Sequence, residues 1–481
     1  MNLVWYRNDL RIHAHRALKE ALQAEGPVTA VYFLCDQQWD EHGVAPLRRW
    51  YVLHSLIELG EQLAARGITL HVQDAGDFSR IPAMLQGFVK QQGISQVFCS
   101  REYPLNERRR DKAVAKALDD AGVSIRGFDD SVLVPPATLR TGKGTPYTVF
   151  SAYKKRWDAW LDSHFQQPEL PGKASAKPVA FADRAVVESA LESVSVAESL
   201  TAHWQPGEQA AATQLEHFVA RHLGQYRKLR DFPSLTATSG LSAALSAGTL
   251  SPASCYLAAR QAMADAGARD GAACWIGELA WRDFYRQIMA QYPRLSWGRA
   301  FRPETDLLKW DSDDALFQAW CEGRTGYPLV DAAMRQLVAT GWMHNRLRMV
   351  TAMFLSKHLW QDWRKGEAFF MAHLIDGDFA ANNGGWQWSA STGTDAVPYF
   401  RVFNPIRQSQ RFDAEGHFIA RWVPELKALD NKTIHEPWKQ PLLVPDYPAP
   451  VVSHAGVRER VTQAFKAVKK DYDDNHAQGG N

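Results

Sequence analysis

The chain has 481 residues, of which 46% are hydrophobic and 22% are charged, and its formal net charge is +2. This composition is ordinary for a globular protein, leaves room for more than one domain, and by charge alone gives no indication of a nucleic-acid partner. No segment approaches the roughly 18 apolar residues of a membrane helix, and the N-terminus lacks a signal-peptide pattern, so we expect a cytoplasmic protein without membrane contacts.

The cysteines are too scattered for a disulfide framework or a metal site. None of the five belongs to a CxxC pair, so we expect reduced, buried thiols and no bound metal. They are Cys35, Cys99, Cys255, Cys274 and Cys321.

The first 130 residues alternate apolar or β-branched segments with helical stretches. The expected strands are residues 3–7, 28–34, 68–73, 96–100 and 124–128. This alternation predicts a parallel sheet with helices on both faces, which gives residues 1–130 an α/β, Rossmann-like fold. No GxGxxG motif follows the first strand, so the usual dinucleotide-binding fingerprint is absent.

The pattern changes near residue 131. Pro, Gly, Ala and Ser become frequent, and residues 131–202 are expected to form a long interdomain linker over the surface. From residue 203 to 470 helical periodicity dominates, which predicts a larger all-α domain. The polar residues 471–481 are expected to be a disordered tail.

The helix expected around residues 274–288 has a second, polar face. Trp275, Glu278, Arg282 and Arg286 align there at i, i+3, i+7 and i+11. Such a face is either a solvated surface with salt bridges, or a site at which a base or another flat ring stacks while the arginines pair with phosphates. The residues alone leave both readings open.

A second expected helix places Asn345, Arg348 and Met349 on one face, whereas Arg346 is expected to point elsewhere. It lies inside a basic stretch, residues 331–365, which holds six Lys and Arg against two Asp. This stretch is either a patch that meets phosphates or a solvated helix face.

Small hydroxyls precede another expected helix. Thr238, Ser239 and Ser242 are suited to a phosphate cradle, because hydroxyls and helix N-terminal N–H groups both donate hydrogen bonds. The same residues are equally suited to ordinary helix caps, which are far more common.

Residues 374–388, LIDGDFAANNGGWQW, are expected to be irregular, because the run is too polar and too rich in glycine for a core helix. Asp376 and Asp378 have no further oxygen ligands at a metal-binding spacing, and could instead cap the next helix. Asn382 and Asn383 can both donate and accept in one plane, and the two glycines that follow permit close backbone approach. Together these groups suit a flat redox ring.

Taken together, the motifs resemble the DNA photolyase/cryptochrome family, most closely the bacterial class I cyclobutane pyrimidine dimer photolyases. The matching segments include VWYRNDLR, NERRRD, WIGELAWRDFYR, TGYPLVDAAMRQL, TGWMHNRLRM, IDGDFAANNGGWQWSASTGTDAVP and YFRVFNP. The resemblance covers the whole chain except the linker and the tail.

The resemblance implies an FAD cofactor in the helical domain. Its phosphates would contact Tyr226, Thr238, Ser239, Gly240, Leu241 and Ser242, and its flavin would contact Trp275, Asn345, Arg348, Asp376, Gly377, Asp378 and Asn382. An Arg348–Asp376 pair would favour a reduced, anionic flavin, and Asn382 would hydrogen-bond near the ring nitrogen that takes up a proton. Gly240 replaces a common Arg of the family, and Gly277 a frequent Asn.

The implied activity is light-dependent repair of cyclobutane pyrimidine dimers in DNA, by electron transfer from excited, reduced FAD to a flipped-out dimer. The implied dimer and DNA contacts are Arg230, Glu278, Trp281, Arg282, Asn345, Arg346, Met349, Trp388, Arg401 and Gln408. Glu278 would hydrogen-bond the dimer. We expect a monomer without an obligate protein partner.

Three tryptophans match the family's electron relay from the surface to the flavin. They are Trp310, Trp363 and Trp386. By residue type alone each is expected in a hydrophobic core, so only the resemblance assigns them to the relay.

Residues 1–130 would carry an antenna chromophore. His42, Asn106 and Glu107 match the positions that contact 5,10-methenyltetrahydrofolate in class I enzymes. Residues 296–298, Ser-Trp-Gly, depart from the pattern of those enzymes, which leaves a deazaflavin or no antenna as alternatives.

Two alternative functions belong to the same family: a cryptochrome-type blue-light receptor without repair activity, and a photolyase for the (6-4) lesion. The short polar tail favours an enzyme over a receptor. Asn345 and Met349 favour dimer repair, because a (6-4) photolyase would be expected to carry histidines in the pocket.

Overall fold

The computed structural model describes residues 1–169 and 177–478. Packing divides the chain into two compact units, each described by itself. The first unit comprises Met1–Arg227, Thr238–Ser296 and Ile375–Ala380, and the second comprises Lys228–Ala237, Trp297–Leu374 and Ala381–Asn481. This grouping does not decide the domain boundaries predicted from the sequence, which stay a prediction.

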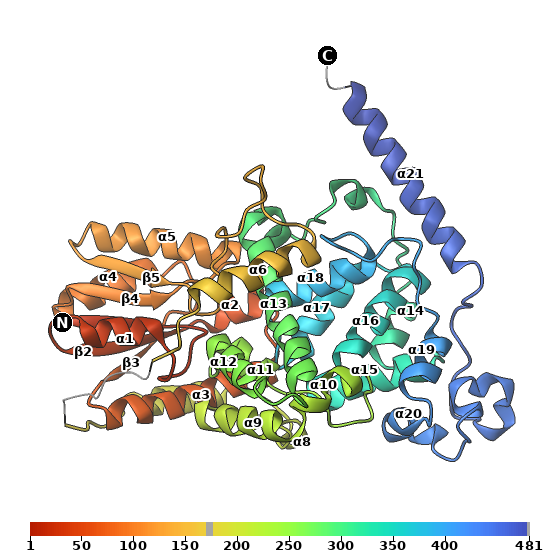
Figure 1. The fold of residues 1–481 in the computed structure, drawn as a ribbon, viewed down its shortest axis with the longest axis horizontal. Coiled ribbons are helices and arrows are strands. Elements are labelled where there is room, and N and C mark those ends of the chain that lie inside the picture. Colours follow the sequence, from red (N-terminus) through yellow and green to blue (C-terminus); the bar gives the residue numbers. More distant parts are fainter. Residues whose placement is uncertain (170–176, 479–481) are drawn as a thin grey trace. The chain divides into compact units, whose positions relative to one another are not determined.

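A five-stranded parallel sheet forms the centre of the first unit (Figure 1). Its strands are β1 (Asn2–Tyr6), β2 (Val28–Leu34), β3 (Leu70–Asp74), β4 (Gln96–Ser100) and β5 (Ser124–Phe128), in the order β3-β2-β1-β4-β5. All four pairings are parallel. The prediction of a parallel α/β sheet is therefore confirmed, with strand bounds within two residues of those expected.

Both faces of this sheet are buried, because alternate side chains of each strand enter different hydrophobic clusters. Val4 and Tyr6 of β1 pack with residues of the helices α1 and α3, whereas Leu3 and Trp5 pack with residues of α4 and α5. This explains why the strands read as continuous apolar runs in the sequence.

The helices of the first unit are α1 (Arg16–Gln23), α2 (Asp36–Glu41), α3 (Pro46–Ala65), α4 (Ile81–Gln92), α5 (Leu105–Asp119), α6 (Phe150–His164), α7 (Arg184–Glu192), α8 (Glu198–Thr201), α9 (Glu208–Arg221), α11 (Ser242–Ala247), α12 (Pro252–Ala262) and α13 (Arg269–Gln291). The short α10 (Tyr226–Leu229) has residues in both units. Residues 131–202, predicted to form a long interdomain linker, contain the helices α6, α7 and α8, and the linker itself stays a prediction. Residues 170–176 of that span lie outside the described residues.

These linker helices form because buried contacts hold them to the rest of the unit. Asp283 of α13 is almost fully buried and accepts hydrogen bonds from the backbone N–H of Leu133 and Val134 and from Trp157 Nε1 of α6. Val187 of α7 lies in the same cluster as the sheet. Tertiary packing thus overrides the weak local signal.

The second unit is helical. Its elements are α14 (Asp314–Cys321), α15 (Pro328–Thr340), α16 (Asn345–Met353), the π-helical turn η4 (Phe354–His358), α17 (Trp363–His373), α18 (Phe379–Ala390, which begins in the first unit), α19 (Pro405–Phe412), α20 (His417–Trp422) and α21 (Val457–Gln478). Short 3-10 turns connect several of them. The predicted all-α character of this part of the chain is confirmed.

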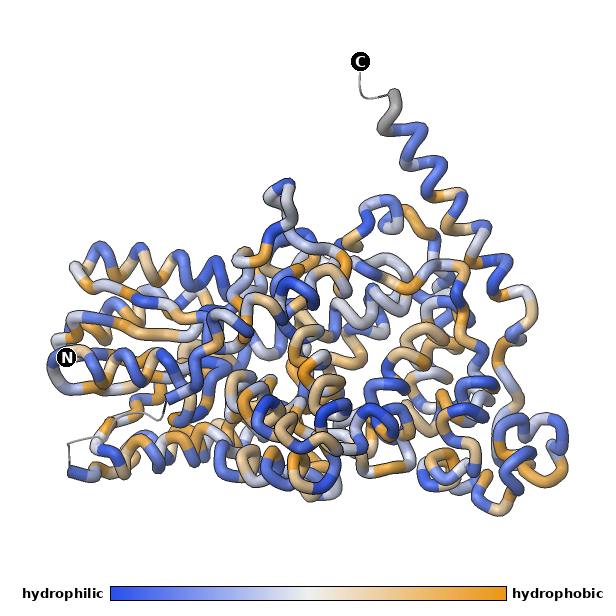
Figure 2. The backbone as a smooth tube through the Cα atoms, viewed as in Figure 1, coloured by the Kyte–Doolittle hydropathy of each residue, from blue (hydrophilic) through white to orange (hydrophobic). Residues whose placement is uncertain are grey.

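The predicted disordered tail is helical in its described part. Helix α21 continues through residue 478, and residues 479–481 lie outside the described residues. Figure 2 shows apolar residues recurring along a mostly hydrophilic helix, and Val457, Val461 and Phe465 pack against Trp360. These packing residues precede residue 471, and the polar composition of residues 471–478 gave no indication that the helix continues. None of the described helices has the length and apolar character required to cross a membrane.

Close packing of α17 on α18 predicts that Gly366 tolerates no larger residue. A Cβ at Gly366 would overlap the ring of Trp386 and the side chain of Leu355. Gly366→Ala should lower the free energy of unfolding by roughly 1–3 kcal/mol, as overpacking does. Gly87→Ala in α4 is the matched control, since no atom lies within 4 Å of its added Cβ, and it should stabilise by about 0.5–1 kcal/mol. Equal effects in thermal or denaturant unfolding would contradict this packing.

Candidate functional site

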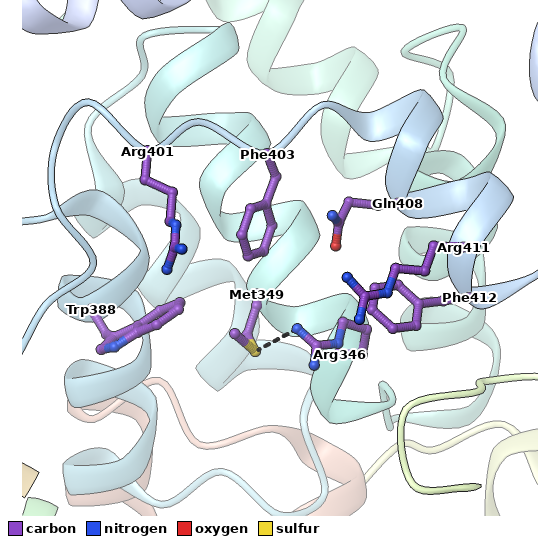
Figure 3. A pocket seen from close by; sticks show the side chains of 8 residues that line it. All are labelled: Arg346, Met349, Trp388, Arg401, Phe403, Gln408, Arg411 and Phe412. Atoms are coloured by element: carbon purple, nitrogen blue, oxygen red, sulfur yellow. Dashed lines mark hydrogen bonds between the residues drawn. The ribbon is translucent and has the colours of Figure 1, made fainter. Parts of the chain in front are cut away.

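A cavity of about 370 Å³ lies in the second unit (Figure 3). Its walls come from α16, α18, α19 and the segment between the last two. The lining residues are Arg346, Met349, Trp388, Arg401, Phe403, Gln408, Arg411 and Phe412. Five of these eight are residues that the sequence assigned to dimer or DNA contact: Arg346, Met349, Trp388, Arg401 and Gln408.

Arg346 enters the cavity from the first turn of α16. His344 caps this helix, and its Nδ1 accepts a hydrogen bond from the backbone N–H of Arg346 at 3.2 Å. Burial lowers the pKa of His344 to about 4, so the cap is a neutral imidazole at neutral pH. The guanidinium of Arg346 contacts Asp231 at 2.9 Å and lies over the ring of Phe412.

Arg346 and Met349 line the same cavity, and Arg346 Nη1 lies 3.9 Å from the Met349 sulfur. The expectation that Arg346 points away from Met349 is therefore wrong. The two residues are three positions apart, which places neighbouring side chains on one helix face.

Aromatic and apolar side chains alternate with arginine side chains around the cavity. Figure 3 shows Trp388 and Arg401 on one side of Met349, and Arg346 and Arg411 on the other. Two polar atoms in the wall are buried without a hydrogen-bond partner among the described residues, namely Gln408 Oε1 and Arg346 Nε. Such a site suits a flat, uncharged group flanked by phosphates, because the rings of the ligand can stack on the aromatic side chains while the guanidinium groups contact its phosphates.

Most of the basic stretch 331–365 does not form a phosphate-binding patch. Arg335 pairs with Glu425, Arg364 with Asp306 and Asp362, and Lys365 with Asp314. Arg348 donates to the carbonyl of Met343, and Lys357 is buried. Only Arg346 of the six lines the cavity, where Arg401 and Arg411 join it.

Residues 379–390 form helix α18, so the prediction of an irregular run is wrong. Side-chain amides support this helix: Asn383 Nδ2 donates to Glu367 Oε1 at 3.0 Å, and Gln387 Nε2 donates to Asn383 Oδ1 at 2.9 Å. Gln387 Oε1 accepts from the backbone N–H of Phe301. Asn382 donates to the carbonyl of Glu367 at 3.0 Å.

The three predicted relay tryptophans belong to one hydrophobic cluster. Trp363 and Trp386 are fully buried in it, and the partly exposed Trp310 packs against it. Trp386 contacts the ring of Trp320, with ring centroids 5.9 Å apart, and Trp310 contacts Trp360, with centroids 4.9 Å apart. A path from partial exposure to full burial is consistent with a relay, but core packing produces the same picture.

The first unit holds the remaining predicted cofactor contacts. Tyr226 and Trp275 are buried, and both contact the ring of Phe218, with centroids 5.7 Å and 4.9 Å apart respectively. Asp376 and Gly377 are buried in the segment before α18, and Asp378 pairs with Arg286 at 2.6 Å.

The predicted phosphate segment is a short turn with hydroxyl groups. Thr238, Ser239 and Ser242 are partly exposed, and Leu241 N–H lies 3.4 Å from Ser239 Oγ. Gly240 has φ +66°, a left-handed conformation that favours glycine over the Arg common in the family. The hydroxyls and backbone N–H groups of this turn suit a pyrophosphate. The buried rings of Tyr226 and Trp275 suit an aromatic cofactor. The chemistry of these residues therefore fits FAD.

On α13 the predicted contacts differ in how they are held. The ring of Trp281 is stacked on Phe150, with centroids 3.5 Å apart, so one of its faces is covered by the chain itself. Arg282 donates to the carbonyls of Ser131 and Leu245, and burial lowers its pKa to about 10. Its guanidinium thus donates to backbone carbonyls, and the prediction that it contacts DNA rests on the resemblance alone.

The remaining predicted dimer and DNA contacts differ in exposure. Glu278 of α13 is partly buried. In the second unit Asn345 is exposed, and Arg230 lies 4.0 Å from Asp231.

The predicted antenna residues come together in the first unit. Asn106 Nδ2 lies 3.0 Å from His42 Nε2, and Glu107 Oε1 lies 3.9 Å from His42 Nδ1. Burial raises the pKa of Glu107 to about 7, and its Oε2 has no hydrogen-bond partner among the described residues. The cluster can therefore accept a hydrogen bond from a bound ring.

Arg411, Phe403 and Phe412 line the cavity but were not singled out from the sequence. The segment YFRVFNP at 399–405 already matched the family motifs, and Arg411 follows Gln408 by three positions on α19. A helical-face argument applied to α19 would have found Arg411 and Phe412.

The comparisons with known proteins agree in naming a family. The family model described as DNA photolyase matches residues 2–172, and the model described as the FAD binding domain of DNA photolyase matches residues 275–467. The chain belongs to the DNA photolyase family. Among curated relatives, the deoxyribodipyrimidine photo-lyase of Escherichia coli is 42% identical over 98% of this chain and 99% of its own length. That of Vibrio cholerae is 41% identical over 98% and 100%.

Solved photolyase structures share the fold. A bacterial class III photolyase from Agrobacterium tumefaciens has a TM-score of 0.87 at 34% identity, covering 98% of both chains. A Synechocystis cryptochrome has a TM-score of 0.84 at 29% identity, also over 98% of both chains. An archaeal photolyase from Sulfolobus tokodaii, described with two FAD molecules, has a TM-score of 0.82 at 28% identity, covering 97% of this chain and 100% of its own. The predicted family and fold are thus confirmed, and the FAD-binding domain is that of a photolyase.

The buried carboxyl of Glu367 makes the photolyase fold sensitive to pH. Burial raises its pKa from 4.5 to about 7, so its stabilising contribution is complete below pH 4.5 and is lost as pH rises through 7. Ionisation then costs about 3 kcal/mol. Glu367→Gln should keep the Asn383 hydrogen bond and reduce the fall in melting temperature between pH 5 and pH 8 by at least about 3 °C.

Asp314→Asn is the control for this prediction, because Asp314 is an exposed carboxylate of the same unit. It should leave the pH dependence of the melting temperature unchanged. A Glu367→Gln variant with the wild-type pH dependence would show that Glu367 is ionised in the folded protein at neutral pH.

Proposed function

We propose that this chain is a light-dependent DNA repair enzyme that splits cyclobutane pyrimidine dimers, a deoxyribodipyrimidine photo-lyase. The observation that carries the proposal is the cavity lined by Trp388, Met349 and three arginines, which joins stacking surfaces to phosphate-binding groups. Relatives of that name at 41–42% identity over nearly the full chain support it.

The substrate contacts follow from the charge and shape of the cavity. Arg346, Arg401 and Arg411 bind phosphates on either side of a flipped-out dinucleotide, and Trp388 stacks on its bases. A dimer pairs and stacks poorly, so its extrusion costs less than that of intact bases. Since phosphates are common to all sequences, binding should be salt-dependent and independent of the surrounding sequence.

FAD is the cofactor of this reaction, and when reduced and excited by light it supplies the electron that opens the cyclobutane ring. Thr238, Ser239 and Ser242 bind its phosphates, with Tyr226, Gly240 and Leu241 beside them. Trp275, Asn345, Arg348, Asp376, Gly377, Asp378 and Asn382 surround its ring. Asn382 is oriented by the carbonyl of Glu367, which fixes the direction of its carboxamide. Glu278 hydrogen-bonds the dimer.

An antenna chromophore binds at His42, Asn106 and Glu107. We propose 5,10-methenyltetrahydrofolate, since Glu107 Oε2, which has no hydrogen-bond partner in the described part of the chain, can accept an N–H from a pterin ring. A deazaflavin is the competing antenna, and so is a second FAD, because the Sulfolobus tokodaii relative carries two FAD molecules. The protein acts in the cytoplasm as a monomer and meets damaged DNA there.

A receptor of the cryptochrome type is the alternative function, because the Synechocystis cryptochrome shares the fold. Repair is the better proposal, since the cavity presents phosphate-binding arginines around stacking surfaces. The repair assay separates the two, because a receptor would bind flavin and absorb light without splitting dimers.

Purified, reduced protein under near-UV or blue light should remove the dimer from an oligonucleotide that contains one thymine dimer. The same mixture in the dark should not, because the electron is available only after excitation. Loss of the dimer is measured by chromatography or by restored restriction cleavage. Protein that contains FAD but removes no dimer in light would overturn the proposed enzyme activity.

Glu278→Ala is the variant that tests the site rather than the fold. It should reduce the rate of repair by about tenfold or more while the flavin absorbance stays unchanged, because one hydrogen bond to the reacting dimer is lost. A colourless variant would instead assign Glu278 to the support of the cofactor site.

Trp386→Phe tests the electron relay. Photoreduction of oxidised flavin by an external reductant should slow by at least about tenfold, because phenylalanine is much harder to oxidise, whereas repair by chemically reduced enzyme should stay near the wild-type rate. Transient absorption and flavin absorbance measure the two rates. Trp320→Phe, a change in the same buried cluster, is the matched control for packing. Unchanged photoreduction in Trp386→Phe would remove it from the relay.

A further inference from the structure

Lys357 is buried without a carboxylate partner. It lies in the π-helical turn η4 with 1% of its surface exposed. Among the described residues no Asp or Glu forms an ion pair with it, and burial alone lowers its pKa from 10.5 to about 7. A buried cation costs free energy, and an apolar side chain of similar volume would often serve stability better. Stability alone therefore does not explain why a lysine occupies this position.

The ammonium of Lys357 joins the two ends of one irregular segment. Nζ donates to Ser391 Oγ at 2.9 Å and to the carbonyl oxygen of Arg401 at 2.9 Å, with the carbonyl of Tyr399 at 3.5 Å. Ser391 directly follows α18 and has φ +64°, and its N–H lies 3.3 Å from the carbonyl of Trp388. One side chain thus joins residues 391 and 401, the two ends of the segment.

Residues 391–401 and the two that follow carry part of the cavity wall. Arg401 and Phe403 line the cavity beside Trp388 (Figure 3). This segment contains no helix or strand, so regular backbone hydrogen bonding does not fix the position of Arg401 relative to the cavity. Backbone hydrogen bonds tie its start to α18, from the N–H groups of Thr392 and Gly393 to the carbonyl of Gln387 at 3.0 and 3.1 Å, whereas Lys357 is the side chain that joins Ser391 to Arg401.

We propose that Lys357 is a positioning residue for DNA binding, which closes residues 391–401 into a fixed loop and so places the guanidinium of Arg401 at the cavity. Lys357 itself is buried below the loop and touches no substrate. The inference rests on the proposed function, because it concerns how the same cavity binds damaged DNA.

The chemistry of the amine makes this positioning depend on pH. An ammonium donates three hydrogen bonds and meets three acceptors here, whereas a neutral amine donates two. Affinity for damaged DNA should therefore fall as pH rises through about 7. The other titratable or charged groups around Lys357 are His358 on its own turn, His454 and Arg460, which contact that turn, and Asp395 and Arg401 in the loop. Burial lowers the pKa of both histidines, so they stay neutral across this range.

The test is a double-mutant cycle on the full-length, FAD-containing protein. Dissociation constants for a duplex with one thymine dimer are measured by fluorescence anisotropy at pH 6.5 and 8.5 for wild type, Lys357→Met, Arg401→Ala and the double variant. Lys357→Met should weaken binding about tenfold at pH 6.5 and make the affinity clearly less dependent on pH than in the wild type, with flavin content and melting temperature retained. The double variant should bind within about twofold of Arg401→Ala, because both changes remove one contact.

Two further variants keep the result interpretable. Lys365→Met removes the same charge from an exposed lysine paired with Asp314 and should leave affinity within about twofold of wild type. Ser391→Ala removes one acceptor and should weaken binding about threefold, and it decides the matter if Lys357→Met does not fold.

Additive effects of Lys357→Met and Arg401→Ala, or wild-type affinity in both Lys357→Met and Ser391→Ala, would overturn the positioning role. These outcomes differ from a failure of the proposed function, in which the wild-type protein itself would neither bind nor repair the dimer.

Discussion

The amide network beneath α18 is the interaction on which the second unit's site depends. Glu367, Asn383 and Gln387 form a chain of buried hydrogen bonds that ends on the backbone of Phe301. Two consecutive glycines in a helix cost about 1 kcal/mol each relative to alanine, so this segment needs such support to be helical. Once α18 forms, Trp386 points into the core, Trp388 into the cavity, and Asn382 toward the carbonyl of Glu367.

Two buried ionisable side chains support the site, although burying a charge lowers the stability of the fold. Glu367 and Lys357 are both buried, and burial brings both pKa values to about 7, from opposite directions. Such groups persist where geometry matters more than stability, and here one orients α18 while the other closes the loop that follows it.

The sequence predicted the sheet well because strands buried on both faces leave long apolar runs that alternate with helices. It failed for α18, where Asn383 and Gln387 look like loop residues until their partners on α17 and near Phe301 are known. It gave no indication of α6 and α7 for a similar reason, since these helices are held by Asp283 and by the sheet cluster. The cavity residues Arg346, Met349, Trp388, Arg401 and Gln408 came from family resemblance, whereas Lys357 was counted only as one charge in a basic stretch.

Two of the three cavity arginines contact an aromatic ring at the cavity. Arg335, Arg364 and Lys365 pair with carboxylates, and so does Arg346 with Asp231, but Arg346 and Arg411 also lie over the ring of Phe412. A cavity that offers mainly phosphate-binding groups and stacking surfaces should distinguish base sequences poorly, because phosphates and ring faces are common to all sequences. In the proposed reaction, selectivity for damage therefore comes from the low cost of extruding a dimer and from the fit of two linked bases against Trp388 and Met349. Loop geometry around Arg401 then decides affinity, which is why a buried lysine beneath that loop affects binding without touching DNA.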